Sequence, residues 1–434
     1  MDHEPPFRSG RSSSGPKHSG RAESSRFRYR VAMNATDFAN ASLPPSTMEF
    51  SCPTRIVFGR GELHNLGALT KTLPGQTGGP LQCKRVLLVV DRGVQAAGHA
   101  AVATESLRAS GIEVTTFSDF RENPTSTMID RGVAAAADRQ PDLLVGLGGG
   151  SSLDCAKAIN FVFCCGGQIA DYRGSGTATA DLLPMIAVPT TAGTGSEVQS
   201  YAIISDDQTH VKMPCGDRRA LPRIAILDPD LITTQPPIVA ALTGIDAISH
   251  AVETCVTRRR TAASAMFSRE AFRHLSGSFT AMIRDPTDLD HAAAMQWGAA
   301  MAGMAIESSM LGAAHATANP LTARYGIAHG QAVGLMLPAV VRLNADHDAN
   351  CQSLYGQLVR TTDPSISDAT AGNWLADRIT QWLRTAGLQT GWSTIEPHVD
   401  IDACATDALA QWTGTFNPVP LTIENVSQLY QSTK

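Results

Sequence analysis

Four residues in the second half of the chain are of types that bind divalent cations. Asp246 and His250 lie four positions apart in LTGIDAISHAVET, so on a helix they would share one face. His315 and His329 lie 14 positions apart in HATANPLTARYGIAH. One carboxylate and three imidazoles suit a cation such as Fe²⁺ or Zn²⁺. For the Asp246–His250 pair alone, an ordinary helix face with a buried histidine is the alternative.

The two later histidines flank a segment that contains Pro320 and Gly326. Both residues tend to interrupt a helix. We therefore predict that His315 ends one helix and that His329 begins the next.

Two loops rich in small residues could hold a phosphate-containing cofactor. GLGGGSSLD (146–154) lies between a predicted strand and a predicted helix, where glycines allow close approach to a pyrophosphate and the helix start offers free N–H groups. It is neither a G-x-G-x-x-G fingerprint nor a Walker loop. PTTAGTGSE (189–197) carries the hydroxyls of Thr190, Thr191, Thr194 and Ser196. A packing or helix-capping role is the alternative for each loop, but the pair together favours a dinucleotide.

Asp91 follows the apolar run KRVLLVV. A carboxylate at the end of such a strand can accept both hydroxyls of an adenosine ribose and would repel a 2′-phosphate, which favours NAD over NADP. A structural turn aspartate is the alternative.

The order of apolar runs predicts an α/β domain followed by an all-helical one. Strands are expected at 54–59, 84–91, 112–118, 142–150 (running into a glycine cluster), at the start of 183–198 and at 201–214 (a hairpin), and the segment 223–232 closes this half. Helices are expected at 99–109, after Thr125 or Ser126, and after Gly150. Alternating strands and helices imply right-handed crossovers and a mainly parallel sheet. Because ligands bind at the carboxyl ends of such strands, Asp91 and both glycine-rich loops should line one crevice.

After Pro236-Pro237 the strand signals largely vanish. Helices are predicted at 238–257, 262–283, 288–308, 330–345, 352–361, 368–386, 401–412 and 422–432. We therefore predict a disordered tail at 1–46, an α/β NAD-binding domain at 47–235 and a helical, metal-binding domain at 236–434. For the Arg- and Ser-rich tail, a targeting or docking role is the alternative to simple disorder.

Composition excludes several classes of protein. A formal net charge of −5 over 434 residues offers no basic field for nucleic acid. The sequence contains no uninterrupted run of about 18 apolar residues, so no membrane span is predicted. The nine cysteines are scattered without C-x-x-C, which is typical of reduced thiols in a cytoplasmic protein.

In this order, the motifs PTRIVFG, GLGGGSSLDCAKAI, PTTAGTGSEV, ILDPDL, GIDAISHAVE and the His315-to-His329 segment resemble the iron-containing (group III) alcohol dehydrogenases over roughly residues 50–434. The resemblance implies a Rossmann-like domain and a helical domain of the dehydroquinate-synthase type. It implies Asp246, His250, His315 and His329 as metal ligands. It also implies a set of cofactor-binding residues: Asp91, Asn123, Gly149, Gly150, Ser151, Asp154, Thr190, Thr191, Thr194 and Lys212.

One position departs from that family. Many members read H-x-x-x-H-P, whereas this chain reads HATANP, with Asn319 in place of the second histidine. An asparagine can hydrogen-bond but cannot titrate near neutral pH. A proton relay through that histidine is therefore not available here.

The resemblance implies reversible oxidation of a primary alcohol to an aldehyde with NAD, at a metal that acts as a Lewis acid. It also implies a homodimer or larger homo-oligomer. The alternatives within the enzymes are a glycerol dehydrogenase, a 3-dehydroquinate synthase, a maleylacetate reductase and a phosphonate-aldehyde reductase. The alternative outside them is a catalytically silent nucleotide-binding protein.

Overall fold

A computed structural model of the protein describes residues 51–75, 79–208 and 211–434. The disordered tail predicted at 1–46 lies outside these described residues. The described residues belong to one compact unit.

The first half of this unit is built on a six-stranded sheet in which every strand pair is parallel. The strand order is β1-β9-β6-β4-β2-β3. The strands are β1 (Arg55–Phe58), β2 (Arg85–Val90), β3 (Glu113–Phe117), β4 (Leu143–Gly148), β6 (Met185–Pro189) and β9 (Ile224–Leu227). The apolar runs of β4, β6 and β9 are buried along their whole length, as expected for parallel strands covered on both faces. The predicted parallel α/β fold is confirmed.

The helices between these strands begin and end close to the predicted positions. The longer ones are α3 (His99–Ala109), α4 (Ser126–Arg139) and α5 (Gly150–Cys165), with short helices α1 (Leu66–Thr70), α2 (Arg92–Ala96) and α6 (Pro229–Ile232). Thr125 is the N-cap residue of α4. The predicted hairpin is present as antiparallel β7 (Tyr201–Ser205) and β8 (Lys212–Gly216), and β5 (Gly174–Ser175) joins β8 in a second, small sheet.

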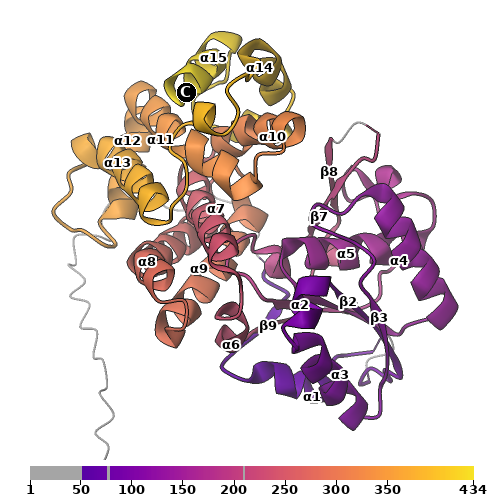
Figure 1. The fold of residues 1–434 in the computed structure, drawn as a ribbon. Helices are drawn as coiled ribbons and strands as arrows, with labels where there is room; N and C mark the ends of the chain where they lie inside the picture. Colours follow the sequence, from indigo (N-terminus) through magenta and orange to yellow (C-terminus); the bar gives the residue numbers. More distant parts are fainter. Residues whose placement is uncertain (1–50, 76–78, 209–210) are drawn as a thin grey trace, which may run out of the picture. The chain divides into compact units, whose positions relative to one another are not determined.

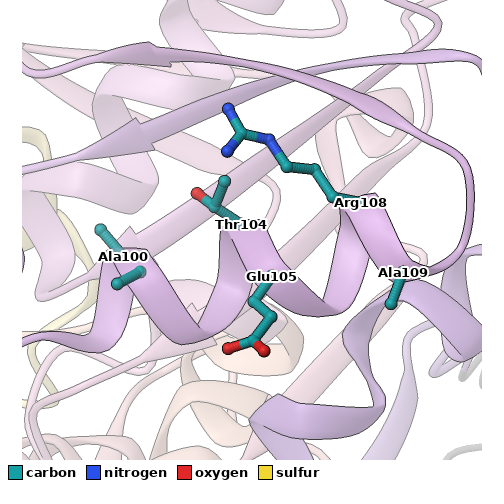
Figure 2. A pocket seen from close by; sticks show the side chains of 6 residues that line it. Ala100, Thr104, Glu105, Arg108 and Ala109 are labelled. Atoms are coloured by element: carbon teal, nitrogen blue, oxygen red, sulfur yellow. The ribbon is translucent and has the colours of Figure 1, made fainter.

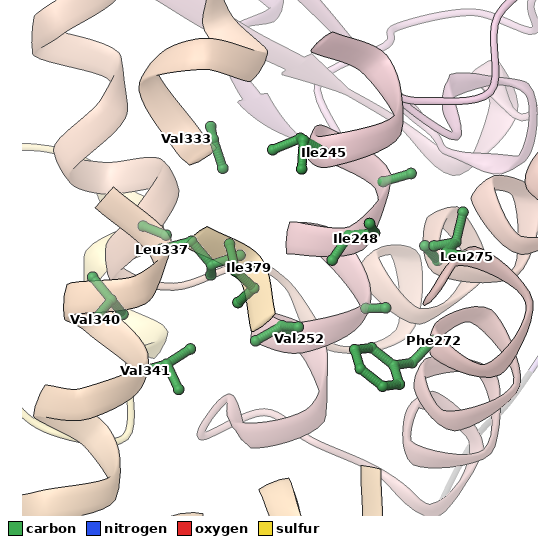
Figure 3. Close-up of a cluster of buried hydrophobic side chains, with 14 of the residues drawn as sticks. Ile245, Ile248, Val252, Phe272, Leu275, Val333, Leu337, Val340, Val341 and Ile379 are labelled. Atoms are coloured by element: carbon green, nitrogen blue, oxygen red, sulfur yellow. The ribbon is translucent and has the colours of Figure 1, made fainter. Parts of the chain in front are cut away.

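The second half is helical (Figure 1). Its helices are α7 (Pro237–Val256), α8 (Ala262–Arg284), α9 (Leu289–Ser309), α10 (Ala313–Tyr325), α11 (His329–His347), α12 (Ala349–Val359), α13 (Asp368–Thr385), α14 (Ile401–Leu409) and α15 (Ile423–Ser432). Figure 3 shows the buried side chains around which they pack: Ile245, Ile248 and Val252 of α7 point toward residues of α8, α11 and α13. The helical half has its own large hydrophobic cluster, which also includes Ala225 of β9, whereas two other clusters lie within the α/β half.

Helix α7 lies at the centre of this helical core. By length and composition it could cross a membrane, but 78% of its most apolar window is buried inside the protein. It also carries Asp246, His250 and Glu253, all of them buried. These features are those of a core helix.

The prediction that His315 ends a helix was wrong, whereas His329 begins α11 as predicted. Residues 313–325 form helix α10, so His315 lies in the first turn of a helix and does not end one. Pro320 lies inside α10, where it costs one backbone hydrogen bond. Distant residues offset this cost, because the Glu253 carboxylate accepts a hydrogen bond from the Ala314 N–H at 2.7 Å and the Tyr430 hydroxyl donates to the Thr317 carbonyl at 2.6 Å. Gly326, with φ of 67°, ends the helix as predicted.

Candidate active site

A deep cleft of about 1190 Å³ is lined by residues of both the α/β domain and the helical domain. That volume exceeds the roughly 300–1,000 Å³ of drug-sized ligand sites, so a dinucleotide and a substrate could share it. Its lining includes every residue predicted to bind the cofactor or the metal, and Asn319 as well. Asp91 and both glycine-rich loops thus line one crevice, as the sequence predicted, and the metal-ligand candidates of the helical domain line it as well.

The four metal-ligand candidates converge on one point of this cleft. The Nε2 atoms of His250, His315 and His329 lie 3.4, 3.5 and 3.8 Å from Asp246 Oδ1. The Nε2 atoms of His250 and His315 are 3.2 Å apart. Asp246 and His250 come from one face of α7, and the other two histidines come from the starts of α10 and α11.

These four side chains fit a divalent cation. Asp246 Oδ1 is buried and has no hydrogen-bond partner among the residues that the structure describes, an arrangement that is costly unless something else binds the oxygen. Three imidazole nitrogens within 3.8 Å of one carboxylate oxygen provide the lone pairs that Fe²⁺ or Zn²⁺ accepts. We therefore regard this cluster as the candidate metal centre.

The pKa values of the three histidines in this cluster are shifted in different directions. Burial lowers the pKa of His250, and burial together with Lys212 keeps the pKa of His329 well below its ordinary value. Burial would also lower the pKa of His315, but the carboxylates of Glu253 and Asp246 raise it to about 9. Because a metal ligand must be deprotonated at its binding atom, a proton on His315 competes with the cation.

Glu253 is a site residue that the sequence analysis missed. Its Oε2 lies 2.5 Å from His315 Nδ1, and its Oε1 accepts a hydrogen bond from the Ala314 N–H. The carboxylate therefore fixes the His315 ring so that Nε2 points toward Asp246. A signal was present in the sequence, because Glu253 lies three residues after His250 and so near the same face of α7.

We expect Glu253→Gln to weaken metal binding by about 10- to 100-fold, the usual cost of losing a partner that orients a histidine ligand. A glutamine keeps the size of the side chain but removes the charge beside His315. Competition with a chelator would measure the dissociation constant for Zn²⁺. The exposed Glu424→Gln is the matched control, and an unchanged constant in Glu253→Gln would refute the orienting role.

The two glycine-rich loops pack directly against each other. A Cβ placed on Gly150 would lie 2.6 Å from Thr194 Cγ2, so no larger residue fits there without a shift. Gly149 is the N-cap of α5, and Gly149, Gly150 and Ser151 at the start of this helix line the cleft. A helix start beside hydroxyl-bearing threonines is a suitable site for an anionic pyrophosphate.

A buried network holds these loops in place. Asp154 Oδ1 accepts a hydrogen bond from the Ser196 hydroxyl at 2.6 Å, and its Oδ2 accepts one from the Ile203 N–H at 3.0 Å. The fully buried ammonium of Lys157, another residue that the sequence analysis missed, donates to Ser196 O and Oγ, both at 2.7 Å, and to Tyr201 O at 2.9 Å. Asp154 lines the cleft, but both its oxygens already have partners within the protein. Its role in the structure is to position the second loop.

The other cofactor candidates lie along the same cleft. Asp91 caps α2 by accepting a hydrogen bond from the Val94 N–H at 3.0 Å, and its second oxygen accepts one from the Ser152 hydroxyl at 3.1 Å. Asn123 has φ of 53°, and its N–H donates to the Ser151 hydroxyl at 3.3 Å. Burial lowers the pKa of Lys212, whereas the nearby carboxylates, Asp246 first among them, favour its charged form.

A second hollow, of about 490 Å³, lies on the surface of α3 (Figure 2). Its lining comes from that one helix and includes Thr104, Glu105 and Arg108. In Figure 2 the Glu105 and Arg108 side chains point away from each other. The hollow therefore lacks the converging groups that the cleft has.

Comparison with known proteins agrees with this geometry. Residues 53–229 match the family model described as iron-containing alcohol dehydrogenase, and residues 240–434 match the model of the C-terminal part of the Fe-containing alcohol dehydrogenase family. The chain belongs to the iron-containing alcohol dehydrogenase family. The predicted family is thus confirmed, and with it the class of enzyme, an alcohol and aldehyde oxidoreductase.

Individual relatives of this alcohol dehydrogenase cover nearly its whole described length. It is 29% identical over 384 residues to the NAD-dependent methanol dehydrogenase of Bacillus methanolicus. This alignment covers 88% of this chain and 99% of that protein. It is 30% identical over 386 residues to the lactaldehyde reductase of Escherichia coli K12, spanning 86% and 96%. The crystal structure of a 1,3-propanediol oxidoreductase superposes with a TM-score of 0.83 at 27% identity and covers 89% of this chain and all of that one.

The structure places Asn319, the position at which the sequence departs from the H-x-x-x-H-P pattern, in the wall of the cleft. Its side-chain amide donates a hydrogen bond to Gln411 Oε1 at 3.0 Å, and both residues line the cleft. Neither amide titrates near neutral pH. The position therefore offers hydrogen bonds, but no proton acceptor.

Proposed function

We propose that this protein interconverts a primary alcohol and its aldehyde with NAD(H), using one divalent cation, Fe²⁺ or alternatively Zn²⁺. The observation that carries the proposal is the convergence of one carboxylate and three imidazoles in the same cleft as the two glycine-rich loops. The balanced reaction is R–CH₂OH + NAD⁺ → R–CHO + NADH + H⁺.

In this proposal Asp246, His250, His315 and His329 hold the cation. When bound, the cation would act as a Lewis acid toward the substrate oxygen. The Asp246 carboxylate is ionised, because burial would raise its pKa but the three imidazoles hold the pKa well below its ordinary range. Its charge offsets part of the charge of the cation.

The cofactor-binding role is assigned to the loops at the carboxyl ends of the strands. The start of α5 and the threonines at 190, 191 and 194 would hold the pyrophosphate, and Asp91 would accept the ribose hydroxyls. Because Asn319 and Gln411 cannot take up the proton that the oxidation releases, we propose that it leaves through water or the ribose hydroxyls.

The same proposal includes the domain limits, the location and the oligomeric state of the protein. We propose domain limits of 47–235 and 236–434, a cytoplasmic location and a homodimer or larger homo-oligomer. The relatives are named for methanol, lactaldehyde and propanediol, so membership of the family does not determine the substrate. A glycerol dehydrogenase-like activity and phosphonate-aldehyde reduction remain the alternatives. A catalytically silent nucleotide-binding protein is disfavoured by the four converging metal-ligand candidates.

The function is tested by NADH oxidation with short neutral aldehydes, with and without added Fe²⁺ or Zn²⁺. We expect turnover that depends on the cation and that is lost with a chelator. No turnover of any aldehyde, despite bound cation and bound NADH, would refute the proposed function.

A further inference from the structure

We propose that Glu307, together with the rings of Tyr201 and Trp412, selects the substrate by the charge of its tail, favouring a cationic tail and rejecting an anionic one. The inference rests on the proposed function and names the class of substrate for that same site. It concerns the part of the cleft that neither the metal candidates nor the cofactor loops occupy.

The residues that line this part of the cleft lie shortly before His315 in the sequence, which connects them to the candidate metal centre. Met310 and Leu311 line the cleft and directly precede α10, whose first turn carries His315. Glu307 lies one turn earlier, near the end of α9, and also lines the cleft. The adjoining wall comes from Gln411, Trp412 and Thr413 of the helical domain and from Tyr201 of β7.

Glu307 is the one charged side chain among these lining residues. Its Oε2 accepts hydrogen bonds from the Ser200 N–H at 2.9 Å and from the Ser200 hydroxyl at 3.0 Å. Its other oxygen, Oε1, accepts no hydrogen bond from the part of the chain that the structure describes. One oxygen therefore fixes the carboxylate in position, and the other is available to a ligand.

The surroundings of Glu307 act in opposite directions on its charge. Burial raises its pKa, whereas the Ser200 donors, Lys157 and Arg218 favour the ionised form. A carboxylate that is partly removed from water acts strongly on a nearby ligand charge, because the effective dielectric constant around it is lower than in bulk water. The expected effects are attraction of a cation and repulsion of an anion.

Two aromatic rings complete the wall from opposite domains. The ring centroids of Tyr201 and Trp412 are 5.8 Å apart and their planes are tilted by 36°. Trp412 is 38% exposed, so part of its ring is open to a ligand. Aromatic faces attract alkylammonium groups, and a carboxylate nearby strengthens such a site.

Lys212 is the cation that could oppose this selection. The carboxylates of Asp246, Asp154 and Glu122 act on Lys212, which places it toward the metal and cofactor candidates. Burial lowers the pKa of Lys212, and these carboxylates favour its charged form at that end of the cleft. Lys157 and Arg218 also act on Glu307, but neither lines the cleft, so the Glu307 carboxylate is the charged group that this wall presents to a ligand.

The test uses three aldehydes of similar size and different charge: (trimethylammonio)acetaldehyde, its neutral isostere 3,3-dimethylbutanal, and the anionic sulfoacetaldehyde. The full-length, metal-loaded protein is assayed by NADH oxidation. We expect kcat/KM for the cationic aldehyde to exceed that for the isostere by about 10-fold, and the anionic aldehyde to be the poorest substrate.

Glu307→Gln is the decisive variant, because glutamine can still accept both hydrogen bonds from Ser200 through its carbonyl oxygen. We expect the cationic and neutral aldehydes to become equal within about 3-fold and turnover of sulfoacetaldehyde to rise by about 10-fold. Trp412→Leu should lower turnover of the cationic aldehyde more than that of the isostere.

Ser200→Ala is the matched control, since it removes one of the hydrogen bonds to Glu307 and keeps the charge. A purely structural role of Glu307 predicts that Glu307→Gln and Ser200→Ala change all three aldehydes by the same factor, and that result would overturn the inference. The proposed function fails separately, if no aldehyde of the three and no short neutral aldehyde oxidises NADH.

Binding without turnover gives an independent measurement. Calorimetric titration of the metal-loaded protein with choline and with 3,3-dimethylbutan-1-ol compares the alcohols of the first two aldehydes. We expect choline to bind about 10-fold more tightly to the wild type and to lose that advantage in Glu307→Gln. Equal affinities in the wild type would contradict a cation-selective wall.

Discussion

Asp246→Asn should abolish metal binding and lower kcat/KM for aldehyde reduction by more than about 1,000-fold, or about 4 kcal/mol of transition-state stabilisation. The reason is that Asp246 Oδ1 is the atom toward which all three imidazole Nε2 atoms point, at 3.4 to 3.8 Å. Asparagine retains the shape of the side chain but removes the negative charge that offsets a divalent cation. Elemental analysis and NADH oxidation measure the two losses.

The control for this variant is Asp402→Asn, which makes the same chemical change at an exposed position in the first turn of α14. It should bind metal and turn over aldehydes as the wild type does. If Asp246→Asn kept its cation and most of its activity, the metal would have to lie elsewhere in the protein.

Lys157→Met should destabilise the protein by about 3–5 kcal/mol, which is the usual cost of removing one partner from a buried charged network. The Lys157 side chain is 0% exposed and donates to three oxygens of Ser196 and Tyr201. Methionine fills a similar volume but leaves those oxygens, and the Asp154 carboxylate 3.7 Å away, without their cation. The midpoint of urea denaturation, monitored by circular dichroism, measures the loss.

The same variant should weaken NADH binding, because Ser196 belongs to the second glycine-rich loop. Lys71→Met, which alters an exposed lysine, is the control and should change neither quantity. A change in the free energy of unfolding below about 1 kcal/mol would mean that water or a rearranged side chain replaces the ammonium.

The sequence predicted the sheet and the crevice well, because local patterns determine both. The runs that became β2 and β4 are apolar without alternation, and only a strand covered on both faces needs such a run. Gly148 ends β4 and Gly149 and Gly150 follow it, and the parallel topology then places them beside the loop that follows β6. Periodicity and topology were sufficient for this part of the site.

What the sequence could not predict depends on contacts between distant segments. Helix α10 contains Pro320 and starts without a capping side chain of its own, so its local signals were poor. It is supported by Glu253 and Tyr430, which are 61 and 113 residues from their partners. The partners of Lys157 and Glu253 are also distant in the sequence. Both residues therefore looked like ordinary helix residues, since a charged residue on a helix is usually solvated.

Asp91 has a consequence for engineering of the cofactor preference. The carboxylate that would exclude a 2′-phosphate is also the N-cap of α2 and the acceptor for Ser152. Replacing it by alanine to admit NADP would remove the cap, at a cost of about 0.5–2 kcal/mol, so lost stability could conceal a gain in specificity. Serine or asparagine would preserve a capping oxygen without the charge. A library built at this position should therefore be restricted to capping residues, with the positive charge for a 2′-phosphate introduced at a neighbouring side chain such as Arg92.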